Sequence, residues 1–190
     1  MRTPILINID IQREYTTQGR PFYLNGIEPS LRNCRRLLRH ARASSWPVIH
    51  VRHIQKKGHL FDEAMEFSRF VEGFEPLPNE PVFTKSNLSC YSDPAFGRMM
   101  ESACHDRVYV AGYNSLMCCL STLVDAFHRG HRLNYVADAS LARATKSADE
   151  AEAHRHATEI LSIYADIVST DQVTADGAEA GRPPVLAVAR

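Results

Sequence analysis

The feature that most constrains the fold of this chain is an alternation of short apolar runs with longer amphipathic segments. The apolar runs have the length of strands and cover residues 5–10, 47–53, 81–85, 108–112, 133–138 and 166–169. The segments with helical periodicity cover residues 30–43, 94–103, 116–129 and 147–164. Strands that alternate with helices form a parallel sheet with helices on both faces. The sequence therefore predicts an α/β fold with a six-stranded, mainly parallel sheet.

Two of the predicted helices begin with recognisable signals. Ser30 stands at the start of the first helix and is a candidate N-cap. Ser147 is followed three residues later by Glu150, which is the spacing of a capping box. Residues 54–80 lie between two predicted strands and have no clean period. Connections of that length tend to be functional, so we expect this segment to contribute to a site.

The composition limits the class of protein. The chain has 190 residues, with 22 basic and 22 acidic side chains and a formal net charge of zero. This length suits one domain, which we place at residues 1–172, followed by an Ala/Gly/Pro-rich tail at 173–190. The balanced charge argues against nucleic acid or a membrane surface as the partner, because both attract basic patches. No segment approaches the roughly 20 apolar residues that a membrane helix requires.

The cysteines favour a reducing compartment. Five cysteines are an odd number for a secreted disulfide framework, and no two of them form a CxxC pair. The N-terminal segment lacks the long apolar region and the cleavage site of a signal peptide. We therefore expect a cytoplasmic protein in which each thiol is either buried or reactive.

Four polar or reactive features follow the predicted strands. Asp10 ends the first strand, His53 the second and Lys85 the third, and the turn at residues 112–118 follows the fourth. The carboxyl ends of parallel strands lie at one edge of a sheet, where folds of this class bind their ligands. These residues, although far apart in sequence, are therefore expected to meet in one site.

Three of these residues form a coherent set for nucleophilic acyl transfer. Cys118 lies in the first turn of a predicted helix, where the helix dipole stabilises a thiolate and free N–H groups can bind an oxyanion. Lys85 would stabilise the thiolate, and Asp10 would take the thiol proton and return it to a leaving amine. Taken singly, the residues also suit a buried core thiol, a solvated lysine and a turn-capping carboxylate.

Three segments of the chain match the motifs of one known family. Residues 10–15, DIQREY, match the opening D-x-Q-x-x-F, with Tyr15 at the aromatic position. Residues 85–91, KSNLSCY, match K-x-x-x-S-A-F, and residues 112–126, GYNSLMCCLSTLVDA, match G-V-A-T-D-x-C-V-x-x-T-A-x-D-A. The chain thus resembles, over roughly residues 4–172, the isochorismatase-like cysteine hydrolases, which include nicotinamidase and N-carbamoylsarcosine amidohydrolase.

This resemblance implies a three-layer Rossmann-like fold and assigns roles within the site. It implies Cys118 as the nucleophile, Asp10 as general base and acid, and Lys85 as their support. It also implies a cis peptide bond between Tyr113 and Asn114, with the amides of Asn114 and Cys118 forming an oxyanion hole. Two departures from the motif, Asn114 and Leu116 in place of a small and an acidic residue, concern the shape of the pocket more than the nucleophile.

The remaining candidates concern substrate and metal. Tyr15, His53 and Tyr113 are assigned to substrate binding, and the aromatic residues between Phe61 and Phe74 are expected to roof the pocket. Nicotinamidase-type relatives carry an Asp-x-His pair and a later histidine as metal ligands. Residues 53–55 here read His-Ile-Gln, and only the later residue, His59, remains. His50 and His53 stand three residues apart on one strand and face opposite sides. We therefore expect no metal and no other cofactor.

The sequence thus predicts a hydrolase that cleaves a C–N bond of a small amide, carbamoyl or ureido compound through a thioester. Two alternatives remain. One is an isochorismatase-type vinyl-ether hydrolase, although that subfamily carries Gly at the position of Cys118; the other is a non-enzymatic receiver-like regulator. Cys119 is the competing nucleophile, and its side chain would point ~100° away around the helix. Cys34, Cys90 and Cys104 are assigned no role. The resemblance also implies a homodimer or homotetramer.

Overall fold

One parallel sheet forms the centre of the molecule. The computed structural model describes residues 3–103 and 107–175. The strands stand in the order β3-β2-β1-β4-β5-β6, and each neighbouring pair is parallel. Their bounds are Ile5–Ile9 (β1), Val48–His53 (β2), Val82–Lys85 (β3), Val108–Tyr113 (β4), Asn134–Leu141 (β5) and Asp166–Val168 (β6). The predicted six-stranded α/β fold is confirmed.

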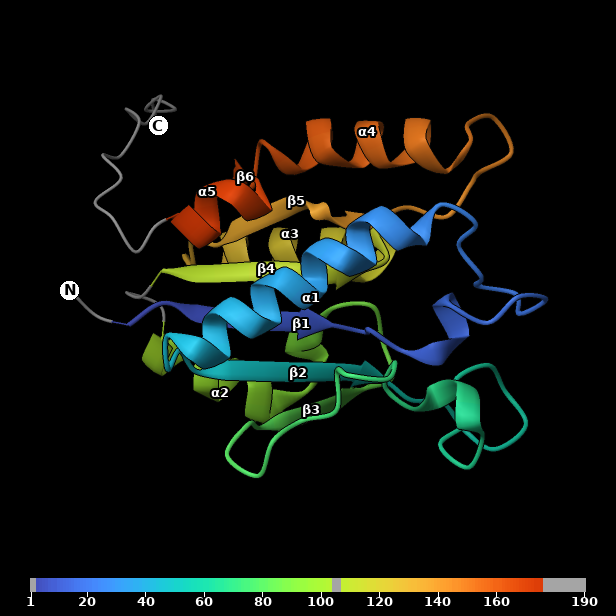
Figure 1. Ribbon diagram of the computed structural model, residues 1–190, viewed down its shortest axis with the longest axis horizontal. Coiled ribbons are helices and arrows are strands. Elements are labelled where there is room, and N and C mark those ends of the chain that lie inside the picture. Colours follow the sequence, from blue (N-terminus) through green and yellow to red (C-terminus); the bar gives the residue numbers. More distant parts are fainter. Residues whose placement is uncertain (1–2, 104–106, 176–190) are drawn as a thin grey trace.

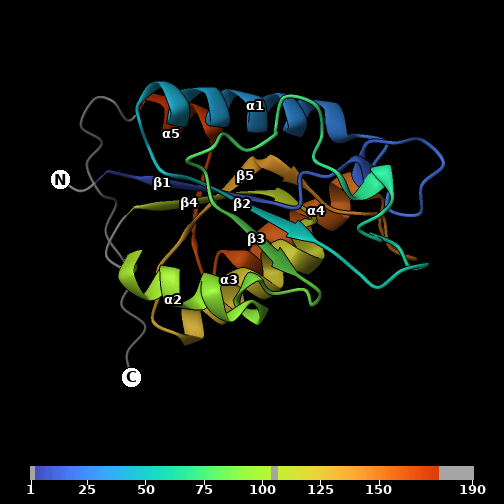
Figure 2. The ribbon, with the colours of Figure 1, turned by 90° about the horizontal axis from the view of Figure 1, so that it is seen from below.

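Helices cover both faces of this sheet. Their bounds are Ile27–Ala43 (α1), Pro94–Ala103 (α2), Leu120–His128 (α3), Glu150–Leu161 (α4) and Thr170–Ala175 (α5). Helices α1 and α5 lie on one face, and α2 and α3 lie on the other, where the end of α4 joins them (Figures 1 and 2). The result is the three-layer arrangement that the alternation of elements predicts.

Side-chain alternation along β1 builds two cores. All five residues of this central strand are buried. Ile5, Ile7 and Ile9 pack with the α2 and α3 side, whereas Leu6 packs with the α1 side. Full burial of an aliphatic side chain contributes roughly 1.5–3 kcal/mol, so the continuous apolar run of β1 stabilises both layers. No described helix is long and apolar enough to cross a membrane.

The prediction of Ser30 as an N-cap is wrong. Ser30 lies inside α1, where its hydroxyl donates to the carbonyl of Ile27. The chain enters α1 through Asn25 and Gly26, whose N–H groups donate to the carboxylate of Glu150 at 2.9 and 2.8 Å. A carboxylate distant in sequence therefore satisfies the start of this helix.

The predicted capping box of α4 is wrong for the same reason. Because Glu150 binds the start of α1, it does not fold back on Ser147. Asp149 is the N-cap, and its side chain accepts a hydrogen bond from the N–H of Glu152 at 2.9 Å. The N-cap therefore lies two residues after the serine that the spacing indicates.

Two element boundaries also differ from expectation. β5 continues to Leu141, beyond the predicted end at residue 138. α5 runs to Ala175 with Val173 buried in the α1-side core, so the tail does not begin at residue 173. Residues 176–190 and Cys104 lie outside the described residues.

Gly112 permits the close approach of β4 to β1. It has φ of +118°, and a Cβ atom at this position would stand 2.0 Å from the carbonyl oxygen of Ile9. A side chain is therefore excluded by backbone atoms that cannot move aside. This approach places the turn after β4 directly beside the end of β1.

Candidate active site

The carboxyl ends of β1, β2, β3 and β4 bring the four predicted features together. The ammonium of Lys85, at the end of β3, lies 2.8 Å from Oδ2 of Asp10, which follows β1. The same nitrogen is 3.2 Å from Sγ of Cys118 and 3.2 Å from Nδ1 of His53. The side chains of Asp10 and Lys85 are completely buried, and Cys118 is 3% exposed. Lys85 is thus the centre of the cluster.

Asp10 stands in a tight turn that ends β1. Its φ is +51°, in the left-handed region that Asp tolerates better than most residues. Its N–H donates to the carbonyl of Val51, and its own carbonyl accepts from the N–H of Gln12. Oδ1 of Asp10 is buried without a hydrogen-bond partner among the described residues. The carboxylate therefore keeps one oxygen available for a proton.

The side chain of Gln12, the glutamine of the first motif, binds backbone groups of two other segments. Its amide oxygen accepts from the N–H of His53 at 2.8 Å, and its amide nitrogen donates to the carbonyl of the same residue at 3.0 Å. The nitrogen also donates to the carbonyl of Ser68 at 2.7 Å. Gln12 therefore fixes the end of β2 and part of the 54–80 segment against the turn that carries Asp10.

The charges of Asp10 and Lys85 act on Cys118 in opposite directions. Burial alone would lower the pKa of Lys85, but the Asp10 carboxylate and the Cys118 sulfur raise it above its ordinary value. Burial and the charge of Asp10 raise the pKa of Cys118, while the charge of Lys85 acts in the opposite direction. In the resting site Cys118 is therefore a thiol beside a carboxylate and an ammonium.

Cys119 occupies a different environment from Cys118. It is completely buried, and its sulfur donates to the carbonyl of Gly112 at 3.5 Å. Burial raises its pKa, and it does not line the cavity described below. Only one of the two adjacent thiols therefore faces a space that a substrate can enter.

The turn after β4 is a π-helix, η4, over Ser115–Cys119. The peptide bond between Tyr113 and Asn114 is cis, as the resemblance implies. Asn114 organises the turn: its side chain accepts from the N–H of Leu116, and its carbonyl accepts from those of Met117 and Cys119. The N–H of Cys118 lies outside the bonds that Asn114 accepts.

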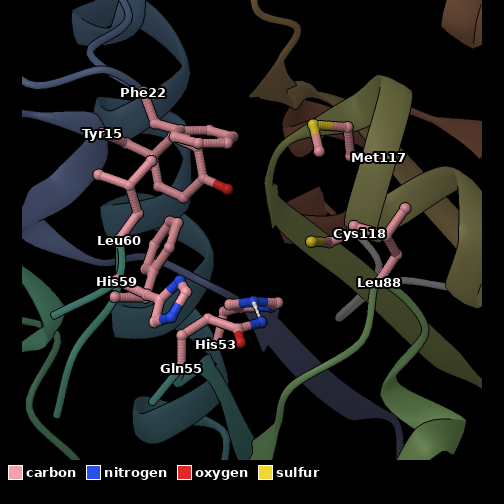
Figure 3. Close-up of a pocket in the computed structure, with 10 residues that line it drawn as sticks. Tyr15, Phe22, His53, Gln55, His59, Leu60, Leu88, Met117 and Cys118 are labelled. Carbon is pink, nitrogen blue, oxygen red and sulfur yellow. Dashed lines mark hydrogen bonds between the residues drawn. The ribbon is translucent and has the colours of Figure 1, made fainter. Parts of the chain in front are cut away.

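A cavity of about 270 Å³ opens beside the cluster. Its lining residues are Tyr15, Phe22, His53, Gln55, His59, Leu60, Phe61, Leu88, Met117 and Cys118. Cys118, Met117 and Leu88 stand on one side, and the aromatic and polar side chains stand on the other (Figure 3). A small molecule in this space would lie against the sulfur of Cys118.

The structure corrects the assignment of Tyr113 to substrate binding. Tyr15 and His53 line the cavity, but Tyr113 does not. Its ring lies behind Tyr15, with 5.6 Å between ring centroids, and its hydroxyl is hydrogen-bonded to that of Ser30 at 2.9 Å. Tyr113 is completely buried and supports the wall of the cavity from behind.

The aromatic roof is also smaller than expected. Of the Phe61–Phe74 aromatics only Phe61 lines the cavity, whereas Phe74 is buried in the α1-side core. Phe22 supplies a second aromatic wall, at 5.5 Å from Phe61 between ring centroids. The sequence did not identify six of the lining residues: Phe22, Gln55, His59, Leu60, Leu88 and Met117. They carry no periodic signal, since they come from loops and from the π-turn.

One group of described side chains could reach a common metal ion. Ligand atoms of Asp10, His53 and Cys118 lie within 4.8 Å of one another. The Lys85 ammonium already contacts all three residues, so a cation of the protein itself stands where a metal would bind. His50 is bonded to Glu80 at 3.0 Å, away from this group.

The chain is similar in sequence and in structure to known proteins. A family model described as the isochorismatase domain matches residues 4–172. A secreted isochorismatase effector of Verticillium dahliae is 26% identical and covers 89% of each chain. Maleamate amidohydrolase of Pseudomonas putida is 26% identical over 69% of this chain and 68% of its own length. A crystal structure of an isochorismatase from Pseudomonas putida KT2440 matches with 30% identity, 89% coverage of each chain and a TM-score of 0.82.

Proposed function

The chain belongs to the isochorismatase family, whose members are hydrolases, and we propose that it is a cysteine-dependent hydrolase of small amides, carbamoyl or ureido compounds. The observation that carries this proposal is the ammonium of Lys85 bonded to both Asp10 and Cys118, beside a cavity that Cys118 lines. A nucleophile, a base and a supporting cation within hydrogen-bond reach form the set that acyl transfer through a covalent intermediate requires.

The first step is attack on the substrate carbonyl. Asp10 takes the proton of the Cys118 thiol, and the Lys85 ammonium stabilises the sulfur while it carries negative charge. The sulfur forms a bond to the carbonyl carbon, and the carbonyl oxygen becomes an oxyanion. Because Lys85 contacts both partners, the positive charge stays in place while the negative charge moves from oxygen to sulfur.

The proposed oxyanion hole consists of the backbone N–H groups of Asn114 and Cys118. The carbonyl and side chain of Asn114 hold the N–H groups of Leu116, Met117 and Cys119. The N–H of Cys118 is not among the donors that Asn114 binds, and N–H groups at the start of a helical turn can stabilise developing negative charge.

The remaining steps release the products. The C–N bond breaks as the amine leaves with the proton held by Asp10, and the acyl group stays on Cys118 as a thioester. Asp10 then takes a proton from a water molecule, which attacks the thioester carbonyl. The acid product leaves, and the proton returns from Asp10 to the sulfur, which restores the starting state.

The relative named maleamate amidohydrolase suggests an amide that carries an acid group. In this chain the guanidinium of Arg143 stands 5.0 Å from the ring centroid of Phe22, which lines the cavity. This cation beside the Phe22 wall favours a substrate that carries a negative charge. We therefore propose monoamides of small dicarboxylic acids as the first compounds to assay.

The experiment is a panel of small amides, carbamoyl compounds and ureido compounds scored for ammonia release. Cys118→Ala should abolish release, whereas Cys119→Ala should retain it, because only Cys118 faces the cavity. Equal activity of the wild-type and Cys118→Ala proteins on an accepted substrate would overturn the cysteine mechanism. Circular dichroism of each variant controls for the fold.

Vinyl-ether hydrolysis is the second candidate, because two of the similar proteins bear the name isochorismatase. That reaction proceeds by acid catalysis without a thiol, so thiol alkylation separates the two. We propose that alkylation of Cys118 abolishes turnover; isochorismate hydrolysis that survives alkylation would favour the alternative.

Two properties of the whole protein are also proposals. We propose a cytoplasmic location, although one relative is a secreted effector. We also propose a homo-oligomeric state.

A further inference from the structure

His53 has a hydrogen-bond donor beside each of its ring nitrogens. Nδ1 lies 3.2 Å from Nζ of Lys85, and Nε2 lies 2.8 Å from Nε2 of Gln55. A neutral imidazole accepts a hydrogen bond at one nitrogen and donates at the other. His53 can therefore accept from only one of these two neighbours.

The charge of Lys85 decides which nitrogen accepts. An ammonium has no lone pair and can only donate. Nδ1 is then the acceptor, and the ring hydrogen belongs to Nε2. Burial and the charge of Lys85 lower the pKa of His53, which keeps the ring neutral and suited to this role.

The orientation of Gln55 leaves two donors side by side. Its amide nitrogen donates to the carbonyl of Ser86 at 2.6 Å, which fixes this nitrogen rather than the oxygen next to His53. Both residues line the cavity, opposite Cys118 (Figure 3). With the ring hydrogen on Nε2, two donors stand 2.8 Å apart and repel each other. An acceptor oxygen of a bound molecule that lay beside this pair, on the cavity side, would relieve the conflict by accepting from both.

The ring of His53 is held in place by its surroundings. Gln12 bonds both the N–H and the carbonyl of its backbone. The ring of Phe61 packs against it with 5.1 Å between centroids. The titratable groups around the ring are Lys85, Asp10, Cys118, Tyr15 and His59. A side chain fixed in this way can in turn fix the ammonium that it contacts.

We propose that His53 is a positioning residue that connects the substrate to the catalytic lysine. Four acceptors surround the Lys85 ammonium, and the carbonyl of Asn87 is the most distant, at 3.4 Å. Nδ1 of His53 takes one hydrogen in place of that carbonyl, so that the other two stay on Asp10 and Cys118. Its Nε2–H, together with the amide of Gln55, receives an acceptor oxygen of the substrate other than the one in the oxyanion hole. The substrate is thus an amide with a second oxygen acceptor, such as a carboxylate or a second carbonyl. This inference rests on the proposed function.

Two variants of His53 separate these roles. In His53→Asn, Oδ1 stands close to the position of Nδ1 and still accepts from Lys85, whereas His53→Leu offers no acceptor. The readout is the rate of Cys118 alkylation by iodoacetamide against pH, followed on the peptide that contains it. We expect His53→Leu to lower the rate at pH 8 by about 10-fold and to move the profile to higher pH, with His53→Asn within about 3-fold of wild type.

Two controls isolate the effect. His50→Leu makes the same change on the same strand, at a residue bonded to Glu80; it should lower Tm and leave the alkylation profile unchanged. Gln55→Leu removes the neighbouring donor without touching Lys85. It should leave alkylation unchanged and raise KM for an accepted amide about 10-fold, the loss of roughly one hydrogen bond to the substrate.

The outcomes distinguish this inference from the proposed function. Equal alkylation profiles for His53→Leu and wild type, or equal losses in His53→Leu and His53→Asn, would overturn the positioning role. An unchanged KM in Gln55→Leu would overturn the second acceptor. Absence of hydrolysis of every amide by the wild type would overturn the proposed function, while the alkylation comparison would still report on His53 and Lys85.

Discussion

Two clusters of ionisable side chains lie beside the same sheet, and they differ in how completely their carboxylate oxygens are bonded. In the first, Glu80 accepts from Arg42 through both carboxylate oxygens, and it also bonds His50 and the N–H of Leu77. In the second, Asp10 bonds Lys85 through one oxygen, and its other oxygen is buried without a partner among the described residues.

The difference separates a structural cluster from a reactive one. Burial acts to raise the pKa of Glu80, but the hydrogen bonds from Arg42, Leu77 and His50 lower it to about 2. Glu80 is thus locked in its charged form. Asp10 and Cys118 share one ammonium in a site that opens to a cavity. Incomplete satisfaction costs stability and leaves a group that can accept a proton.

The largest expected effect comes from removing the base of the reactive cluster. Asp10→Asn retains the shape but cannot take the proton of Cys118, so kcat should fall by about 10²–10⁴-fold, the usual contribution of general base catalysis. Steady-state ammonia release measures this. A kcat close to the wild-type value would show that the two clusters do not differ in the way described.

The matching change in the structural cluster should affect stability alone. Glu80→Gln removes the charge that Arg42 and His50 bind, and we expect a loss of about 1–3 kcal/mol in the free energy of unfolding. Urea denaturation measures the loss, and kcat should be unchanged. A large fall in kcat without a change in stability would contradict the separation.

Acid should weaken the structural cluster in a defined range. The pKa of Glu80 is lowered from 4.5 to about 2 in the folded chain, so its contribution is present above pH 4.5 and is lost as the pH falls toward 2. The pKa of His50 is lowered below 6.5 by burial, so the unfolded chain gains its proton first, and stability falls below pH 6.5. Tm against pH, for wild type and Glu80→Gln, should converge near pH 2.

The smallest expected effect is that of a substitution at Tyr113, which lies just behind the cavity. Tyr113→Phe removes one buried hydrogen bond to Ser30, which should cost about 1 kcal/mol in the free energy of unfolding. KM should not change, because Tyr113 does not line the cavity. A raised KM would return Tyr113 to the substrate site.

The sequence predicted the residues at the strand ends better than the residues that surround them in the cavity. Asp10, His53 and Lys85 end apolar runs, and strand ends of a parallel sheet meet by topology. Their convergence therefore follows from local patterns. The choice of Cys118 over Cys119 rests on the resemblance, in which Cys118 matches the cysteine of the motif. Helical geometry adds only that adjacent side chains point in different directions.

The parts that could not be predicted depend on contacts between distant segments. Glu150 serves the start of α1 from 125 residues away, so neither Ser30 nor Ser147 takes the role that local spacing suggests. Phe22 reaches the cavity from a loop with no periodic pattern. Tyr113 lies within the motif, but its side chain direction depends on the packing of Tyr15 and Ser30.

The central claim is that Cys118 carries the acyl group of the substrate. Its most direct measurement is mass spectrometry of acid-quenched protein after mixing with an amide that the enzyme hydrolyses. We predict a mass increase equal to the acyl group on the peptide with Cys118, present in Cys119→Ala and absent in Cys118→Ala. Full hydrolytic activity in Cys118→Ala, with no acyl adduct on the wild-type protein, would contradict the account.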